Sequence, residues 1–113
     1  MLNKIVSLSK NEDFKKLLTG RKTSNKYFTV FFKKIAEKDH NNLNISFVVK
    51  RKLGNAVKRN KIKRRLRNIM NDAIKKISIK LTYSYLVIAK PPMLNSEFNN
   101  IKETLFQEFK GIK

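Results

Sequence analysis

The sequence predicts an α+β fold: a single compact domain over residues 1–113, with a small central sheet and helices packed on it. Segments 27–35, 43–49 and 81–89 are rich in aromatic and β-branched residues, which is typical of strands. Apolar residues recur at helical spacing in three other segments. The chain has 113 residues, 41% of them hydrophobic, which favours one folded core over a disordered chain.

The first helix is expected after residues 9–12, SKNE, which read as a capping box: a hydroxyl three residues before a glutamate. Phe14, Leu17 and Leu18 follow at i, i+3 and i+4. We expect Gly20 to end this short helix. Residues 21–26, RKTSNK, are polar and basic, and we interpret them as a connector.

Two strands are expected next, over residues 27–35 and 43–49. The first carries aromatic residues on both faces, so either both faces are covered or one contributes to a binding surface. The polar segment 36–42 predicts a turn, and with it a hairpin between the two strands. A third strand, over residues 81–89, ends before the prolines at 91 and 92.

Residues 50–68, KRKLGNAVKRNKIKRRLRN, contain ten basic residues and no acidic one. We expect a helix from the N-cap Asn55 to about Ile77. One side of this helix is apolar, with Ile62, Leu66, Ile69, Met70, Ala73 and Ile77. Another side carries the row Arg59, Lys63 and Arg67 beside Asn60 and Arg64. Such a helix can pack on a core and present its cations to phosphates.

The start of this helix is itself a candidate anion site. Lys58 and Arg59 lie in the first turn, where cations oppose the helix dipole at a cost of about 0.3–1 kcal/mol each. An anion held by these side chains and the free N–H groups would offset that cost. The alternative is a basic surface helix with no special partner.

A last helix is expected from the N-cap Asn95 to Gly111, with Phe98, Ile101, Leu105, Phe106 and Phe109 at helical spacing. The predicted element order is therefore α-β-β-α-β-α. Residues 43–89 are consistent with a βαβ unit. If its strands are parallel, the general rule predicts a right-handed crossover.

Composition constrains the partners. The formal net charge is +19, so nucleic acid is the leading partner and an anionic membrane surface the second. No apolar run approaches the roughly 18 residues of a membrane span. The N-terminus lacks the apolar core of a signal peptide, so we expect a cytoplasmic protein. The sequence has no cysteine, which excludes disulfides and thiolate zinc sites.

The residues for bond chemistry are sparse. His40 is the only histidine and is expected to be a solvated loop residue. The acidic residues form no cluster able to hold two metals, and no glycine-rich phosphate loop is present. We therefore expect no catalytic residue, metal site or cofactor on the protein itself.

Residues 49–67 resemble the signature of the bacterial ribonuclease P protein subunit, roughly V-S-K-K-x-G-x-A-V-x-R-N-x-I-K-R-x-x-R. Residues 11–14, NEDF, and 87–91, VIAKP, also resemble segments of that family. The resemblance implies a protein that binds the catalytic RNA of ribonuclease P and helps it cleave the 5′ leader from precursor tRNA. It also implies that the RNA supplies the active site and its Mg²⁺. A left-handed βαβ crossover is implied as well, against the general rule.

The resemblance further implies site residues. Contacts to the catalytic RNA would be made by Arg51, Lys52, Arg59, Asn60, Lys63, Arg64 and Arg67. Lys61 stands where the family often has arginine, and Lys58 joins the set through its place in the first helical turn. A cleft between the first helix and the sheet would take the single-stranded leader, with Phe14, Leu18 and Phe31 at matching positions. Phe14 and Leu18 are equally consistent with plain core packing.

Three rival functions share the charge. A ribosomal or general RNA-binding protein would have a similar build, but it gives no reason to prefer precursor over mature tRNA. A DNA-binding domain is disfavoured because the basic helix lacks dimerisation heptads and follows no helix-turn-helix. A peripheral membrane protein is disfavoured because the apolar side of the helix has no wide aromatic face.

Overall fold

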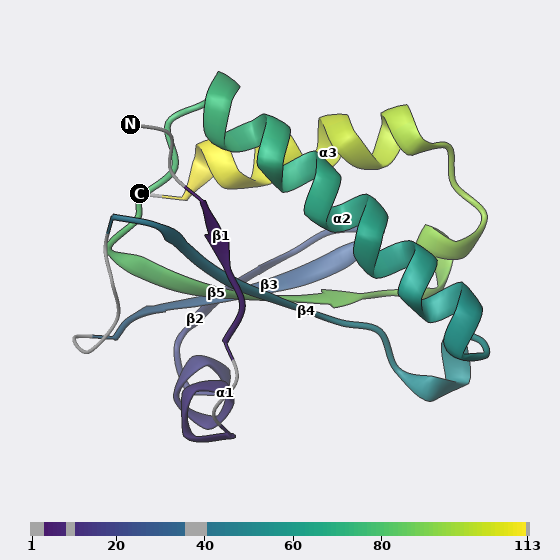
Figure 1. Cartoon of the computed structure of the whole chain (residues 1–113), viewed down its shortest axis with the longest axis horizontal. Helices are drawn as coiled ribbons and strands as arrows, with labels where there is room; N and C mark the ends of the chain where they lie inside the picture. Colours follow the sequence, from purple (N-terminus) through teal and green to yellow (C-terminus); the bar gives the residue numbers. More distant parts are fainter. Residues whose placement is uncertain (1–3, 9–10, 36–40, 113) are drawn as a thin grey trace.

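The computed structural model describes residues 4–8, 11–35 and 41–112. A five-stranded mixed sheet has two helices, α2 and α3, on one face and one helix, α1, on the other (Figure 1). This arrangement confirms the α+β prediction. The elements are β1 (Ile5–Val6), α1 (Asn11–Leu18), β2 (Arg21–Ser24), β3 (Phe28–Lys34), β4 (Leu43–Val48), the 3₁₀ turn η1 (Arg51–Leu53), α2 (Ala56–Lys76), β5 (Tyr83–Ala89), the 3₁₀ turn η2 (Pro91–Leu94) and α3 (Phe98–Gly111).

The strand order is β1-β4-β5-β3-β2, with β5 at the centre. Strand β4 runs parallel to β5, and β3 runs antiparallel to it, so that Val87 of β5 lies between Phe47 and Val30. The predicted hairpin between residues 27–35 and 43–49 is therefore wrong. Alternating apolar residues specify which face of a strand is buried, but they do not specify its neighbour.

The connection from β4 through α2 to β5 is left-handed. In Figure 1 both strands run in the same direction, α2 lies above the sheet, and β5 lies behind β4. Seen from the helical side with the strands pointing up, β5 is to the left of β4. This confirms the left-handed crossover implied by the family resemblance, and it is opposite to the general rule.

Two strands were not predicted. β1 is a parallel partner of β4 only two residues long, and β2 pairs with β3 through residues 21–24. The interpretation of residues 21–26 as a connector is therefore wrong for their first four residues. An edge strand needs one hydrogen-bonding partner and no apolar face, so the polar sequence RKTS carries no strand signal.

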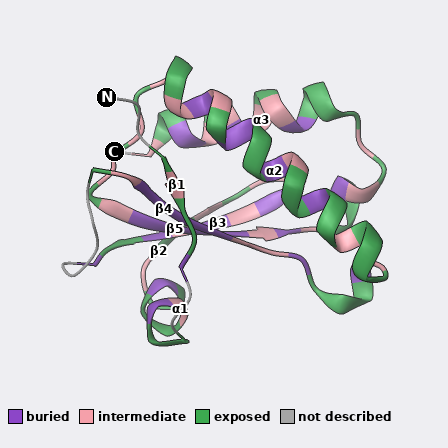
Figure 2. Cartoon of the chain, in the orientation of Figure 1, coloured by how far each residue is buried: buried purple, intermediate pink, exposed green. Residues whose placement is uncertain are grey.

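The larger core lies between the sheet and helices α2 and α3. It includes Phe28, Val30, Leu43, Ile45, Tyr85 and Val87 from the strands. As predicted, the apolar side of α2 is buried against it, and Figure 2 shows the buried sides of both helices turned toward the sheet. Ile77 is half-buried just beyond the last residue of α2.

A smaller core lies under α1 on the other face. Leu17 is fully buried there with Leu8, Ile35 and Leu86. Gly20 allows the close approach of α1 to β3, because a Cβ atom at this position would lie 2.7 Å from the Phe32 carbonyl oxygen. The helix ends at Leu18, as expected if Gly20 is the C′ residue that follows the C-cap. Ser9 of the predicted capping box lies outside the described residues.

The predicted start of the last helix is two residues early. Glu97 is the N-cap of α3, and Asn95 instead ends the 3₁₀ turn that follows β5. The two prolines at 91 and 92 start that turn, so the chain needs several more residues before it can enter a helix. Gly111 is the last residue of α3, as predicted.

Candidate nucleic-acid interface

The first turn of α2 is built around Asn55 and Gly54. The Asn55 side chain accepts a hydrogen bond from the Lys58 N–H at 2.9 Å, which confirms the predicted N-cap. Gly54 has a φ of 150°, a conformation that favours glycine, and a Cβ atom there would lie 3.1 Å from Lys58 Cβ. Lys58 and Lys61 are both exposed at this end of the helix.

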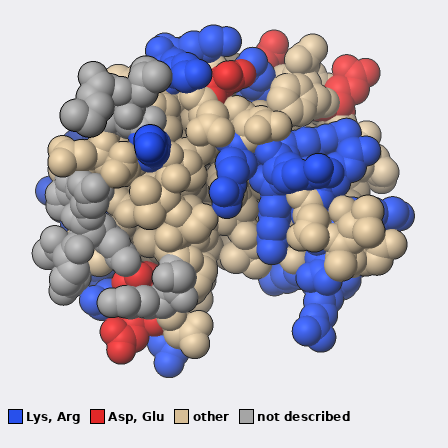
Figure 3. Space-filling view, in the orientation of Figure 1, with Lys and Arg blue, Asp and Glu red and all other residues tan. Residues whose placement is uncertain are grey.

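A basic surface follows the solvent side of α2. Asn60, Lys63, Arg64 and Arg67 are exposed and, with Val57, line a shallow hollow of about 590 Å³. Figure 3 shows Lys and Arg side chains gathered over α2. Four of the predicted RNA-binding residues are thus brought together on one exposed face. Hereafter this hollow is called the α2 surface.

Arg59 is placed differently from its predicted neighbours. It is half-buried, and its Nε atom is buried without a hydrogen-bond partner among the described residues. Arg67, about two turns further along the helix, donates a hydrogen bond from Nη2 to Ser7 Oγ at 3.1 Å. This bond ties the N-terminal segment to the α2 surface.

A second basic hollow of about 310 Å³ lies between the start of α2 and η2. Lys58, Lys61 and Arg65 line it beside Leu53, Ile62, Leu94 and Asn95. Arg65 was not predicted as a site residue. The sequence pattern could have indicated Arg65, because Lys58, Lys61 and Arg65 recur at i, i+3 and i+7 on one helical face.

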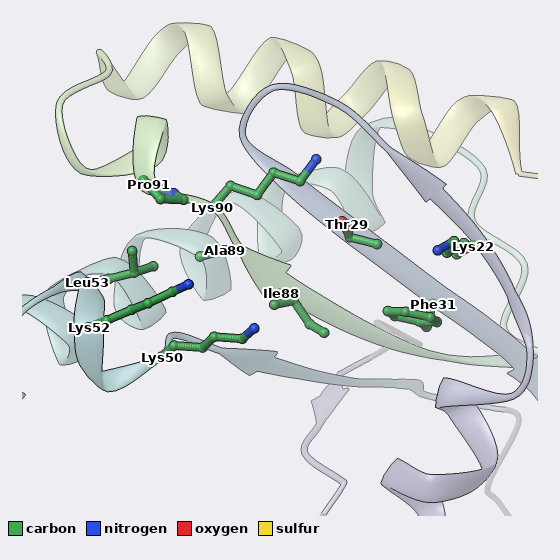
Figure 4. A pocket seen from close by; sticks show the side chains of 10 residues that line it. All are labelled: Lys22, Thr29, Phe31, Lys50, Lys52, Leu53, Ile88, Ala89, Lys90 and Pro91. Atoms are coloured by element: carbon green, nitrogen blue, oxygen red, sulfur yellow. The ribbon is translucent and has the colours of Figure 1, made fainter.

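A third basic site, a cleft of about 310 Å³, opens on the α1 face of the sheet (Figure 4). Its floor is formed by Thr29 and Phe31 of β3 and Ile88 and Ala89 of β5. Leu53 and Pro91 add apolar walls. The lysines around it come from three separate segments: Lys22, Lys50, Lys52 and Lys90.

The predicted cleft residues separate in the structure. Phe31 lines the cleft, whereas Phe14 is half-buried and packs on the smaller core. Leu18 is 51% exposed and does not line the cleft. Phe31 and Ile88 also pack against the smaller core, so the cleft floor continues into the side chains beneath α1.

The cleft also contains residues that the sequence did not single out. Lys22 lies on the unpredicted edge strand β2, where it faces Phe31 across the ladder with Nζ 5.9 Å from the ring centroid. Lys52, predicted as a contact to the catalytic RNA, lies at this cleft, while Arg51 is exposed beside it in η1. Segments far apart in sequence meet here, so spacing alone could not reveal the group.

The acidic side chain on α2 is engaged away from the α2 surface. Asp72 accepts a hydrogen bond from Lys102 Nζ of α3 at 3.2 Å. This hydrogen bond and the charge of Lys102 hold the pKa of Asp72 below its usual range. The ion pair joins α2 to α3. Asp72 is therefore paired with Lys102 and not with the cations of the α2 surface.

The described part of the chain contains neither a candidate metal site nor a membrane-spanning helix. No three His, Cys, Asp or Glu residues gather there into a group able to hold a metal. None of the helices in residues 4–8, 11–35 and 41–112 is long and apolar enough to cross a bilayer. His40 lies outside the described residues.

Comparison with known proteins decides the family. The sequence matches the family model described as Ribonuclease P over residues 2–113. The chain belongs to the ribonuclease P protein family. It is 33% identical to the ribonuclease P protein component of Listeria innocua over 110 residues, covering 96% of this chain and 89% of that protein. The component of Carboxydothermus hydrogenoformans is 34% identical over 116 residues, covering 99% and 95%.

Solved structures of the ribonuclease P family have the same fold. The protein from Thermotoga maritima superposes with a TM-score of 0.81 at 29% identity, covering 96% of this chain and 98% of that one. The Staphylococcus aureus protein gives a TM-score of 0.73 at 35% identity, covering 91% and 90%. The chain is therefore the protein subunit of a ribonuclease P endoribonuclease and a partner of its RNA. Family membership favours this role over that of a general RNA-binding protein.

Proposed function

We propose that this subunit binds the catalytic RNA through the α2 surface and η1, and holds the 5′ leader of precursor tRNA in the cleft. Endonucleolytic removal of the leader would then mature the 5′ end of the tRNA. The observation that carries the proposal is the presence of separate basic sites on opposite faces of the sheet. One site can bind the ribozyme while the other binds the substrate.

The α2 surface suits a folded RNA. Its cations lie on one rigid helix whose apolar side is anchored in the core, so their spacing is set before binding. Each phosphate that they neutralise releases counterions. The RNA-binding residues of the proposal are Arg51, Lys52, Lys58, Arg59, Asn60, Lys61, Lys63, Arg64 and Arg67. Arg65 joins them through the second hollow.

The cleft suits a single strand. Phe31 offers a ring on which a base can stack, and the surrounding lysines can contact the phosphates on either side of it. A leader strand held here raises the affinity for precursor tRNA and leaves the affinity for mature tRNA unchanged. The subunit would thereby favour binding of substrate over product.

We place the catalytic groups and Mg²⁺ on the RNA. The α2 surface and the cleft are lined by lysine, arginine, asparagine, threonine, alanine, proline and other apolar residues, which bind phosphates and bases but supply no carboxylate. The proposal includes neither a membrane nor DNA as partner. The apolar side of α2 is buried against the sheet, so bilayer insertion would require its removal from the core. The proposed location is the cytoplasm, where bacterial tRNA is transcribed and matured.

The test is cleavage of a 5′-extended precursor tRNA by the cognate ribonuclease P RNA at low Mg²⁺, with and without the protein. Binding of precursor and mature tRNA is measured in parallel. We expect faster cleavage with the protein and tighter binding of precursor than of mature tRNA. Stimulation with equal binding of the two tRNAs would remove the leader cleft from the proposal. RNA binding without stimulation would remove the role in cleavage.

A further inference from the structure

The turn between β2 and β3 is organised by Asn25. Its side-chain oxygen accepts hydrogen bonds from the N–H groups of Tyr27 at 2.8 Å and Phe28 at 3.1 Å. Its own N–H donates to the Phe28 carbonyl oxygen at 3.0 Å. The turn is therefore a single hydrogen-bonded unit, and a contact that fixes the position of Asn25 fixes the whole turn.

Helix α3 holds this turn from one side. Glu108 accepts a hydrogen bond at Oε1 from Asn25 Nδ2, at 3.0 Å, and one at Oε2 from Thr23 Oγ1, at 2.7 Å. Both bonds are part-buried, and both end on oxygens of the same carboxylate group. A single carboxylate thus joins α3 to both the strand and the turn.

The end of β5 holds the turn from the other side. Lys90 Nζ donates to Ser24 Oγ at 2.6 Å and to the Asn25 carbonyl oxygen at 2.7 Å. In Figure 4 its side chain runs along the cleft toward the turn. Lys22, Lys50 and Lys52 make no such hydrogen bonds within residues 4–8, 11–35 and 41–112, so their ammonium groups are available to a ligand.

The geometry of β2 connects the contacts of Glu108 to the cleft. Successive residues of β2 point to opposite faces of the sheet. Thr23 points toward α3 and Glu108, so Lys22 points to the opposite face, where it lines the cleft. β2 is an edge strand whose only strand partner is β3. The hydrogen bonds from Thr23 and Asn25 to Glu108 therefore help to set the position of Lys22.

We propose that Glu108 is a positioning residue for leader binding: through Thr23 and Asn25 it holds β2, and with it Lys22, at the rim of the cleft. This inference rests on the proposed function, in which the leader occupies that cleft. Glu108 lies on the far side of the sheet from the leader and acts only through the strand. Lys90 holds the turn from the end of β5, and the contacts to the leader phosphates are made by Lys22 and Lys50.

The test replaces Glu108 in the full-length protein reconstituted with its RNA. We expect Glu108→Ala to lower the preference for precursor over mature tRNA about fivefold, the equivalent of roughly 1 kcal/mol. Affinity for the catalytic RNA and for mature tRNA should not change. The matched control is Glu103→Ala, which removes the same charge from an exposed position on the same helix and should leave the preference intact. Thr23→Val removes one of the two bonds and keeps a β-branched residue in the strand, so it should show part of the loss.

A double-mutant cycle separates positioning from general destabilisation. If Glu108 acts through Lys22, Glu108→Ala should have no further effect on the preference in a Lys22→Ala background. Glu108→Gln, which retains one acceptor oxygen, should recover part of the preference. Additive losses in the cycle, or an unchanged preference in folded Glu108→Ala and Thr23→Val, would overturn the inference while leaving the proposed function in place. A wild-type protein with no preference for precursor tRNA would instead overturn leader binding itself.

Discussion

Removing two charges from the α2 surface should flatten the salt dependence of RNA binding. The change is Lys63→Gln together with Arg64→Gln. Both side chains are exposed, and neither donates a hydrogen bond to another described residue. Exposed substitutions of this kind usually change the free energy of unfolding by less than about 0.5 kcal/mol. The variant therefore tests binding rather than folding.

The expected magnitude comes from counterion release. If the wild type neutralises about six phosphates, the slope of log K against log salt concentration is roughly −4 to −5. Losing two contacts should reduce the slope to about −3. Between 50 and 200 mM salt, the wild type would then lose roughly 500-fold in affinity and the variant roughly 60-fold.

The assay is equilibrium binding of the catalytic RNA at a series of monovalent salt concentrations and constant Mg²⁺. The matched control is Lys75→Gln with Lys76→Gln, which removes the same net charge from exposed positions in the last turn of the same helix. We expect the control to keep the wild-type slope. An unchanged slope for the first pair, or an equal change for both pairs, would refute a localised RNA contact on the α2 surface.

Further predictions concern the cleft and the core. Phe31→Leu keeps an apolar floor but removes the ring, and should lower the binding of precursor tRNA relative to mature tRNA by about 1–3 kcal/mol in competition binding. Gly20→Ala forces a Cβ atom against the Phe32 carbonyl oxygen, and should reduce the free energy of unfolding in urea by about 1–3 kcal/mol. Tyr85→Phe removes the hydrogen bond to the Lys80 carbonyl oxygen, at 2.6 Å, and should cost about 1 kcal/mol in the same assay. Burial raises the pKa of Tyr85 above its ordinary value of 10.0, so its stabilising contribution is present below pH 10 and declines at higher pH as the unfolded chain ionises. Alkaline unfolding of Tyr85→Phe should therefore show a shallower pH dependence than that of the wild type.

Helix α2 shows how much local sequence can specify. Its N-cap, its buried side and most of its exposed basic row were predictable, because capping and 3.6-residue periodicity depend on residues within a few turns of one another. Arg59 shows the limit of the same reasoning. Its position in the basic row was correct on the helical wheel, but its exposure depends on neighbouring elements that periodicity does not describe.

The sheet shows what local sequence cannot specify. Strand periodicity identified the segments that form β3, β4 and β5 and the residues that share a face, but the insertion of β5 between the other two was missed. Strand β2 was missed because its polar residues need only the edge of β3 as partner. The handedness of the crossover came from the family resemblance, since no local pattern encodes it.

The sequence by itself determined the family, the α+β class and the basic helix, because these depend on composition and on contiguous motifs. Only the tertiary structure decided the composition of the cleft. Lys22, Phe31, Lys50 and Lys90 come from β2, β3, the segment before η1 and the end of β5, and chain folding alone brings them within one cavity. The tertiary structure also decided the hydrogen bond between Asn25 and Glu108. These residues are 83 positions apart and meet because α3 packs across the sheet onto its edge.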